Sequence, residues 1–254
     1  MDKHIHTHGM DLAVISMEPG WIAMEKPCHM SIHNQPGKDL CSLVLAHLEK
    51  EPELAEYLGC DFSYGVHAVN RLDKQTSGVV ILACRPDIFR FLARNFENRE
   101  VEKLYFALLH GGFETGHETG VWDWPLTKKA EGGYFPQGKG RRVASMTRYR
   151  IIETSPHYTM AELSPLTGRK HQIRRHARLA GHPVVGDNRY GTVRSLRYLK
   201  SRYGFSRLAL HCMSMTLKLP GKDLPETLTS PVIPREIKEL FEMDRSIDAF
   251  NHPG

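Results

Sequence analysis

Residues 70–83 read NRLDKQTSGVVILA, a polar loop followed directly by an apolar run. The run GVVILA at 78–83 is rich in β-branched residues, which favour a buried strand. The loop before it places one carboxylate, Asp73, between Arg71 and Lys74. Nearby cations keep a carboxylate ionised, and an ionised carboxylate on a rigid scaffold can act as a nucleophile. The same residues also fit a surface aspartate in a salt-bridged turn, so both interpretations stay open.

The loop ends in Thr76-Ser77-Gly78, where the hydroxyls can hold a turn and the glycine tolerates a positive φ. Outward from here, the sequence predicts strands separated by single helices. Asp39 is expected to cap a helix whose buried face carries Leu40, Leu43, Val44 and Leu48, and Pro86 to open one carrying Ile88, Phe91, Leu92 and Phe96. Other expected strands are 14–26 (two, with a turn at Pro19-Gly20), 103–110, 143–153 and 158–163, and other expected helices are 170–180 and 235–243. Without strict βαβ alternation, the predicted fold class is α+β, with a mostly antiparallel mixed sheet and flanking helices.

The 254 residues are expected to form a flexible N-terminal segment (1–12), one catalytic domain (13–244) and a C-terminal tail (245–254). Residues 128–142, rich in glycine and cations, predict a mobile loop rather than a linker. The default expectation is a monomer, because no coiled coil or apolar interface helix is evident.

Composition narrows the class of protein. Hydrophobic residues make up 41% and charged residues 25%, as in ordinary globular proteins. No apolar run approaches the roughly 20 residues that span a bilayer, and the N-terminus lacks a signal-like apolar core, so a cytoplasmic protein is expected. Five dispersed cysteines without CxxC spacing argue against a zinc knuckle or a disulfide framework. His4, His6 and His8 could bind a metal ion, but a frayed polar terminus is favoured.

Cations cluster in the second half of the chain, within a net charge of +5. The first run is Arg169, Lys170, Arg174, Arg175 and Arg178, and the second is Arg189, Arg194, Arg197, Lys200, Arg202 and Arg207. Such clusters are the electrostatic footprint of a polyanion site, although a solvated basic face gives the same pattern.

The segment 168–176, GRKHQIRRH, predicts a basic helix capped by Thr167. Cations in a first helical turn oppose the macrodipole by about 0.3–1 kcal/mol each, which suggests that they hold an anion. Arg174 is expected to turn inward and pair with a buried carboxylate, while Ile173 faces the core.

Two motifs carry a resemblance to a known family. NRLDKQTSG (70–78) resembles the RLDxxTSG signature around the nucleophile of RluA-type RNA pseudouridine synthases, and GRKHQIRRH followed by GHPVVGDNRYG (181–191) resembles their later motif. Weaker matches lie at 25–33, at Lys-Leu-Tyr 103–105 and at RLALH 207–211. The five occur in the family's order and cover roughly residues 14–220.

The resemblance implies roles for individual residues. Asp73 would be the nucleophile and Arg174 its ion-pair partner. Tyr105 would stack on the target base and take part in proton transfer, and Ile173 would pack beneath the uracil. The candidates for RNA contacts, with Ile173, are Arg71, Lys74, Lys103 and Lys170. Without the resemblance, Tyr105 reads as a strand aromatic and Ile173 as a core residue.

The chain departs from the family at Asn70, where histidine is usual, and at Cys28, where alanine or serine is common. An asparagine can still hydrogen-bond backbone or a flipped-out nucleotide. The expected function is isomerisation of uridine in structured RNA, foremost tRNA, because the chain is similar to compact members of the tRNA pseudouridine synthase C type, without an S4-like domain. Because such an isomerisation involves no redox change, the resemblance implies that no cofactor and no metal are required. Alternatives are the same activity on 23S rRNA, a non-catalytic RNA-binding protein, and a glycoside or nucleoside hydrolase with paired carboxylates.

Overall fold

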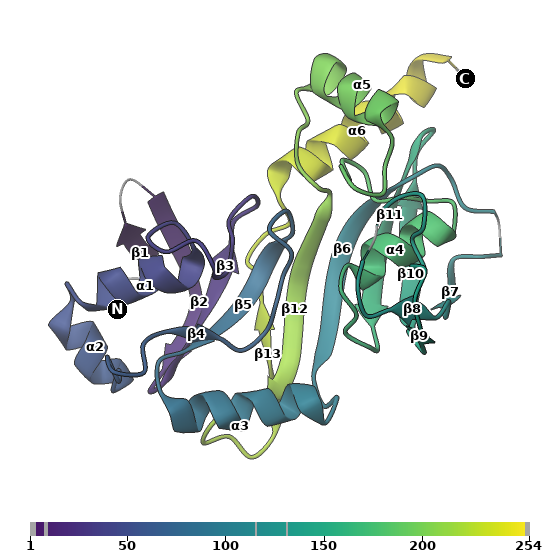
Figure 1. Ribbon diagram of the computed structural model, residues 1–254. Coiled ribbons are helices and arrows are strands. Elements are labelled where there is room, and N and C mark those ends of the chain that lie inside the picture. Colours follow the sequence, from purple (N-terminus) through teal and green to yellow (C-terminus); the bar gives the residue numbers. More distant parts are fainter. Residues whose placement is uncertain (1–3, 8–9, 115, 131, 252–254) are drawn as a thin grey trace. The chain divides into compact units, whose positions relative to one another are not determined.

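The computed structural model describes residues 4–7, 10–114, 116–130 and 132–251, which form two compact units (Figure 1). Unit 1 comprises Met1–Lys103 and Cys212–Pro231, and unit 2 comprises Leu104–His211 and Val232–Gly254. A catalytic domain can consist of more than one compact unit, so the single domain over 13–244 stays a prediction.

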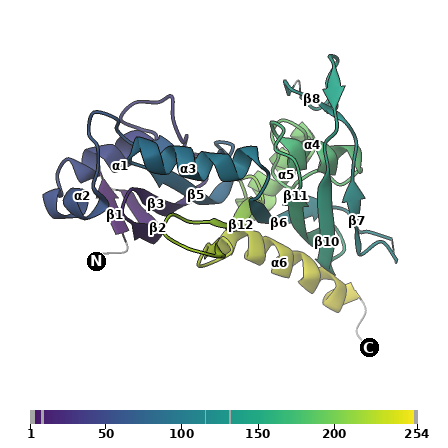
Figure 2. The same cartoon turned by 90° about the horizontal axis from the view of Figure 1, so that it is seen from below.

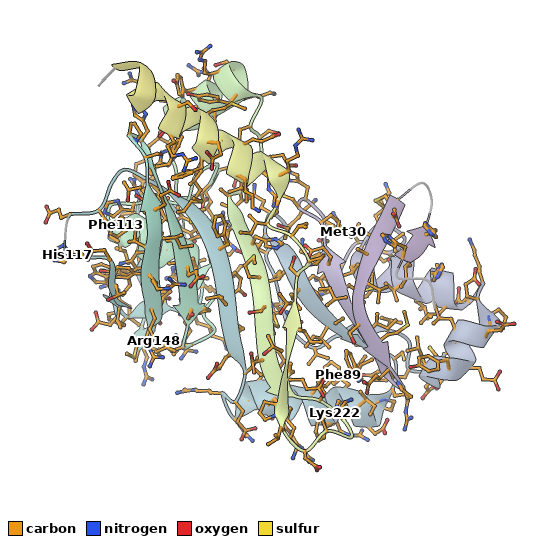
Figure 3. All side chains as sticks on the ribbon, turned by 180° about the vertical axis from the view of Figure 1, so that it is seen from behind. Met30, Phe89, Phe113, His117, Arg148 and Lys222 are labelled. Atoms are coloured by element: carbon orange, nitrogen blue, oxygen red, sulfur yellow. The ribbon has the colours of Figure 1, made fainter. Side chains whose placement is uncertain are left out.

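The sheet of unit 1 holds the run that follows Asp73. Its order is β1 (His4–Thr7), β2 (Met10–Glu18), β3 (Trp21–Lys26), β5 (Ser77–Ala83) and β12 (Leu210–Lys218, in this unit from Cys212), with β13 (Pro225–Thr229) on β12 and β4 (His67–Ala68) on β5. The pairs β1–β2, β2–β3, β3–β5 and β12–β13 are antiparallel. Every residue of β5 is buried, which confirms the strand predicted from GVVILA. Figure 3 labels Lys222 between β12 and β13, where its Nζ lies 3.2 Å from Glu18 Oε1.

The helices of unit 1 follow the predicted caps. α1 (Leu40–Leu48) starts after Asp39, whose side chain accepts from the Ser42 N–H at 2.9 Å, and it buries the four predicted residues. α2 (Pro52–Leu58) was not predicted. α3 (Pro86–Glu97) begins at the predicted proline, but Phe91 is 37% exposed, and Asn95 takes a buried place beside Leu92. α1 packs on β1 and α3 on β5 (Figure 2).

Unit 2 is built on a run of four neighbouring antiparallel strands. Its order is β6 (Glu102–His110, in this unit from Leu104), β11 (Tyr158–Pro165), β10 (Thr147–Thr154) and β7 (Thr119–Trp122). β8 (Leu126–Thr127) and β9 (Arg142–Val143) form a separate hairpin, which is why β10 starts later than predicted. α4 (Gln172–Leu179) packs on β10 and β11, and Arg148 on β10 points outward (Figure 3). The predicted α+β class with mostly antiparallel pairing is confirmed.

Two further helices lie at one end of unit 2 (Figure 1). α5 (Val193–Tyr203) was not predicted, and α6 (Arg235–Asn251) is longer than predicted. α6 is fixed by Asp244, which is 1% exposed and accepts from Ser155 Oγ at 2.5 Å, from the His157 N–H at 2.9 Å and from His157 Nδ1 at 2.7 Å. Of the predicted C-terminal tail, residues 245–251 therefore continue this helix, and 252–254 lie outside the described residues.

At the N-terminus, β1 and β2 form a hairpin in which His4 Nδ1 lies 2.8 Å from Asp11 Oδ1. His8 lies outside the described residues, and the described part of the chain contains no cluster of three or more ligands suited to a metal ion. The flexibility expected for 1–12 stays a prediction. Within the described ranges, none of the helices has the length and apolar character needed to cross a membrane.

Candidate active site

The loop that carries Asp73 connects β4 to β5 in unit 1 and is bonded by Lys26, the last residue of β3. Lys26, at the end of β3, is 0% exposed, and its Nζ donates to the carbonyl oxygens of Pro27 (2.8 Å), Met30 (3.0 Å) and Lys74 (3.3 Å). Within the loop, the Thr76 N–H donates to the Asp73 carbonyl at 3.0 Å. A buried ammonium group needs such hydrogen-bond partners. The bond from Lys26 to the Lys74 carbonyl therefore holds the loop in this position.

Asn70 fastens the start of the same loop to β5. Its side chain is buried, donates to the Val79 carbonyl at 3.3 Å and accepts from the Ile81 N–H at 2.8 Å. The expectation that an asparagine at this position can hydrogen-bond backbone is therefore confirmed.

Gly78 ends the loop in a conformation that only glycine adopts without strain. Its φ is +113°, and a Cβ there would lie 2.2 Å from the Cys212 carbonyl oxygen and 2.6 Å from the Cys212 nitrogen. The predicted positive φ is confirmed. Because the clash is with backbone of the neighbouring strand β12, it cannot be relieved by rotating a side chain.

Gly78→Ala is therefore expected to lower the free energy of unfolding by about 3 kcal/mol, from backbone strain and overpacking together. Urea unfolding monitored by circular dichroism measures this. Gly37→Ala is the matched control, because Gly37 has φ +75° but no atom within 4 Å of the added Cβ. Equal losses in the two variants would show that the clash with Cys212 contributes nothing.

The cations proposed for RNA in unit 1 are of two kinds. Arg71 and Lys74, on either side of Asp73, are exposed. Lys103 on β6 is half-buried, with its Nζ 5.8 Å from the centroid of the Phe96 ring, and burial lowers its pKa.

In unit 2, Arg174 on α4 forms a buried ion pair with Asp187. The two side chains are 4% and 0% exposed, and Arg174 donates from Nε to Oδ2 at 2.7 Å and from NH2 to Oδ1 at 2.8 Å. The sequence correctly predicted that Arg174 turns inward to a buried carboxylate. Asp187 lies in the segment GDNRYG, and sequence reasoning assigned it no role; it is the single carboxylate of that motif, which is the signal that could have found it.

Asp187 is itself held by backbone. Its Oδ1 also accepts from the N–H groups of Arg189 and Tyr190, each at 2.9 Å. The Tyr190 ring centroid lies 5.4 Å from the Arg174 guanidinium, and the Tyr190 hydroxyl lies 3.1 Å from His171 Nδ1. The guanidinium therefore has a fixed orientation, set by the turn that follows Gly186.

The start of α4 differs from the prediction. The helix is preceded by His171 in a left-handed conformation (φ 55°), and Thr167 does not cap it; its hydroxyl donates to Gln172 Oε1 at 2.6 Å. Arg169 and Lys170 consequently precede the helix. The prediction that they lie in its first turn, where the macrodipole would repel them, is wrong. Lys170 is exposed and remains available to a ligand.

Arg175 and His176 are internal rather than part of a basic surface. Arg175 is 0% exposed and donates to the carbonyls of Thr127 (3.0 Å) and Gln137 (2.8 Å), which ties the β8–β9 hairpin to α4. His176 lies 2.9 Å from Thr147 Oγ1 through Nδ1 and 3.0 Å from the Trp124 carbonyl through Nε2. The first basic run therefore contributes less positive charge to the surface than the sequence predicts.

Tyr105 and Ile173 are both almost buried in unit 2, at 8% and 6% exposure. Tyr105 lies on β6 opposite Leu163 of β11, and Ile173 lies on α4 next to Arg174. The candidate residues thus divide between the units: Arg71, Asp73, Lys74 and Lys103 belong to unit 1, and Tyr105, Lys170, Ile173 and Arg174 belong to unit 2.

Acid is expected to destabilise the fold through His211, which is fully buried and whose pKa is lowered to about 4 by burial and by Arg207. In the unfolded chain this imidazole titrates near pH 6.5, so between these values the unfolded state binds more protons. The contribution of the neutral His211 to stability is complete above pH 6.5. As the pH is lowered, the free energy of unfolding decreases, by about 2 kcal/mol at pH 5. Urea unfolding at pH 7.5 and 5 measures this, and His211→Gln should flatten the dependence; an unchanged slope would contradict it.

Comparison with known proteins shows which family this chain is similar to. The family model described as RNA pseudouridylate synthase matches residues 20–179. Ribosomal large subunit pseudouridine synthase C of Vibrio vulnificus is 31% identical over 215 residues, which cover 83% of this chain but only 62% of that protein's length. tRNA pseudouridine synthase C of Haemophilus ducreyi is 29% identical over 246 residues, or 91% and 95% of the two chains. The solved structure of human RNA pseudouridylate synthase domain containing 4 has a TM-score of 0.65 at 25% identity, covering 90% and 92%.

Proposed function

Because the chain belongs to the RNA pseudouridylate synthase family, we propose that it is an isomerase that converts uridine to pseudouridine within structured RNA. The observation that carries the proposal is the carboxylate of Asp73 on a loop whose backbone is bonded by Lys26 and whose first residue, Asn70, is bonded to β5. The reaction breaks the N1–C1′ bond, turns the uracil and joins C5 to C1′. It involves no net redox change.

In this proposal Asp73 attacks the sugar or removes a proton from it, and Arg174 acts as its ion-pair partner, keeping it ionised when bound RNA excludes water. The target base must be flipped out of the RNA to react, and Tyr105 would receive it by stacking while Ile173 packs beneath it. Arg71, Lys74, Lys103 and Lys170 would contact phosphates. The exposure of Arg71, Lys74 and Lys170 supports their proposed contacts with phosphates.

The proposed substrate class is tRNA, with 23S rRNA as the second candidate. The relative named for tRNA matches this chain over nearly the full length of both, which favours tRNA. The relative named for the large ribosomal subunit extends well beyond the match, so rRNA stays an outcome of the test. We propose that the protein acts as a monomer in the cytoplasm, with RNA as its partner.

The test is to incubate the purified protein with RNA from cells that lack its gene and to map pseudouridine by carbodiimide-based sequencing. A new pseudouridine in tRNA is the expected result, and one in 23S rRNA would change the substrate. Release of free uracil without pseudouridine would indicate a hydrolase. RNA that is bound but unchanged would indicate a non-catalytic RNA-binding protein.

A further inference from the structure

The two basic runs of the sequence differ in their exposure to solvent in unit 2. In the first run, Arg174 and Arg175 are buried and bonded within the unit. In the second run, the cations of α5 face solvent. The surface charge predicted from the sequence is therefore concentrated on a helix that the sequence did not predict.

α5 carries four cations and no acid in its sequence VRSLRYLKSRY. Arg194, Arg197, Lys200 and Arg202 are all exposed, and Leu199 is the buried residue of this helix. None of the four forms an ion pair with another described residue, and the sequence contains no aspartate or glutamate from position 188 to position 222. Cations this close repel one another, so the helix favours a polyanionic partner.

The nearest acidic helix does not supply that partner. α6 follows at the same end of unit 2 (Figure 1), and its glutamates have their own cations. Glu236 lies 3.6 Å from Arg207, Glu239 lies 2.5 Å from Arg235, and Glu242 pairs with Arg245. The positive charge of α5 therefore remains uncompensated within the described residues of the unit.

α5 is also well formed for a helix with a single buried residue. Thr192 accepts from the Ser195 N–H at 3.1 Å at its start, and Gly204 ends it in a left-handed conformation with φ 64°. Its 11 residues span about 16 Å, and Arg194, Arg197 and Lys200, spaced three residues apart, follow one side of the helix, while Arg202 lies on another side. Tyr198, 53% exposed, lies among them with its ring centroid 5.8 Å from that of Tyr203.

We propose that α5 is a docking surface for the phosphate backbone of a helical RNA segment, separate from the residues that act on the target uridine. The identity of the RNA rests on the proposed function, but the docking does not require turnover. Clustered exposed cations fit a phosphate backbone, whereas a helix that lies in a membrane surface needs a continuous exposed apolar face to insert. α5 buries Leu199 in the unit and exposes Val193 and Tyr198 singly. Contacts of this kind fix the position of an RNA without reading its bases.

The experiment compares two variants that each lower the net charge from +5 to +1. The first is R194Q/R197Q/K200Q/R202Q. The control is K50Q/R90Q/R94Q/K218Q, four exposed cations of unit 1. The probe is a fluorescein-labelled 16-base-pair RNA duplex without unpaired uridine, titrated by anisotropy at several salt concentrations, with circular dichroism to confirm that both variants fold.

The α5 variant is expected to bind the duplex about tenfold or more weakly at 0.1 M salt, and the slope of log K against log salt should fall by about 1 for each phosphate that α5 no longer neutralises. The control variant should stay within about threefold of the original protein. Equal losses in both variants would overturn the proposal in favour of net charge alone. Unchanged duplex binding by the α5 variant would also overturn it, as would loss of binding to phosphatidylglycerol vesicles in its place.

The outcome is separable from that of the proposed function. Duplex binding that depends on α5, in a protein that forms no pseudouridine, would leave the docking surface standing and remove the isomerase. Pseudouridine formation by a protein whose duplex binding does not depend on α5 would support the isomerase and overturn the docking surface.

Discussion

Replacing Asp73 with alanine is expected to abolish pseudouridine formation, with a loss of roughly 10⁴-fold or more, because it removes the carboxylate that we propose as the nucleophile. The fold should survive, since Lys26 holds the backbone of this segment and Asn70 bonds to the backbone of β5. Binding of RNA should also survive, because phosphate contacts supply most of the affinity.

The measurement is release of tritium from RNA that carries uridine labelled at C5, since that hydrogen leaves when C5 joins the sugar. Asp73→Asn, which keeps the shape and removes the charge, should be nearly as inactive as Asp73→Ala. Asp223→Asn is the matched control, an exposed aspartate in the turn between β12 and β13 of the same unit. Activity within tenfold of the original protein in Asp73→Asn would rule out a nucleophilic carboxylate.

Asp187→Asn is expected to destabilise the chain by about 3–5 kcal/mol, because it removes the charge that Arg174 meets in a buried site. Breaking one side of a buried pair leaves the other charge poorly solvated, which costs more than the pair itself contributes. Urea unfolding followed by tryptophan fluorescence measures the change.

The matched control for this prediction is Glu162→Gln, which breaks the pair with Arg150 at 2.6 Å. That arginine is 60% exposed, so the loss should stay below about 1 kcal/mol. In a further variant, Arg174→Gln combined with Asp187→Asn removes both charges and should recover part of the stability. Similar losses for Asp187→Asn and Glu162→Gln would mean that burial does not determine the strength of the Arg174 pair.

The fold could be predicted where the signal is local. Asp39 and the apolar spacing after it specified α1, and the β-branched run specified β5, because cap and periodicity are written within ten residues. α5 escaped because its composition is mostly cationic and its helix buries only Leu199. The start of α4 escaped because His171 takes a left-handed conformation that glycine or asparagine ordinarily signals.

The sequence predicted the residues of the candidate site better than the partners that hold these residues in place. The inward turn of Arg174 followed from helical spacing, but its partner Asp187 lies 13 residues later, beyond the helix. Lys26 reaches the Lys74 carbonyl across 48 residues, and no pattern in either segment announces that bond. Contacts between segments distant in sequence depend on the packing of the sheet, which periodicity does not encode.

The attachment of the Asp73 loop through its backbone has a consequence for how this chain can change. Lys26 binds the carbonyl of residue 74, while the side chains of Arg71 and Lys74 point into solvent. Mutation can therefore change these two side chains, and with them the proposed phosphate contacts, without displacing the carboxylate between them. The proposed chemistry and the proposed phosphate contacts thus lie within four consecutive residues and can change separately, so that RNA binding can evolve on an unaltered reaction.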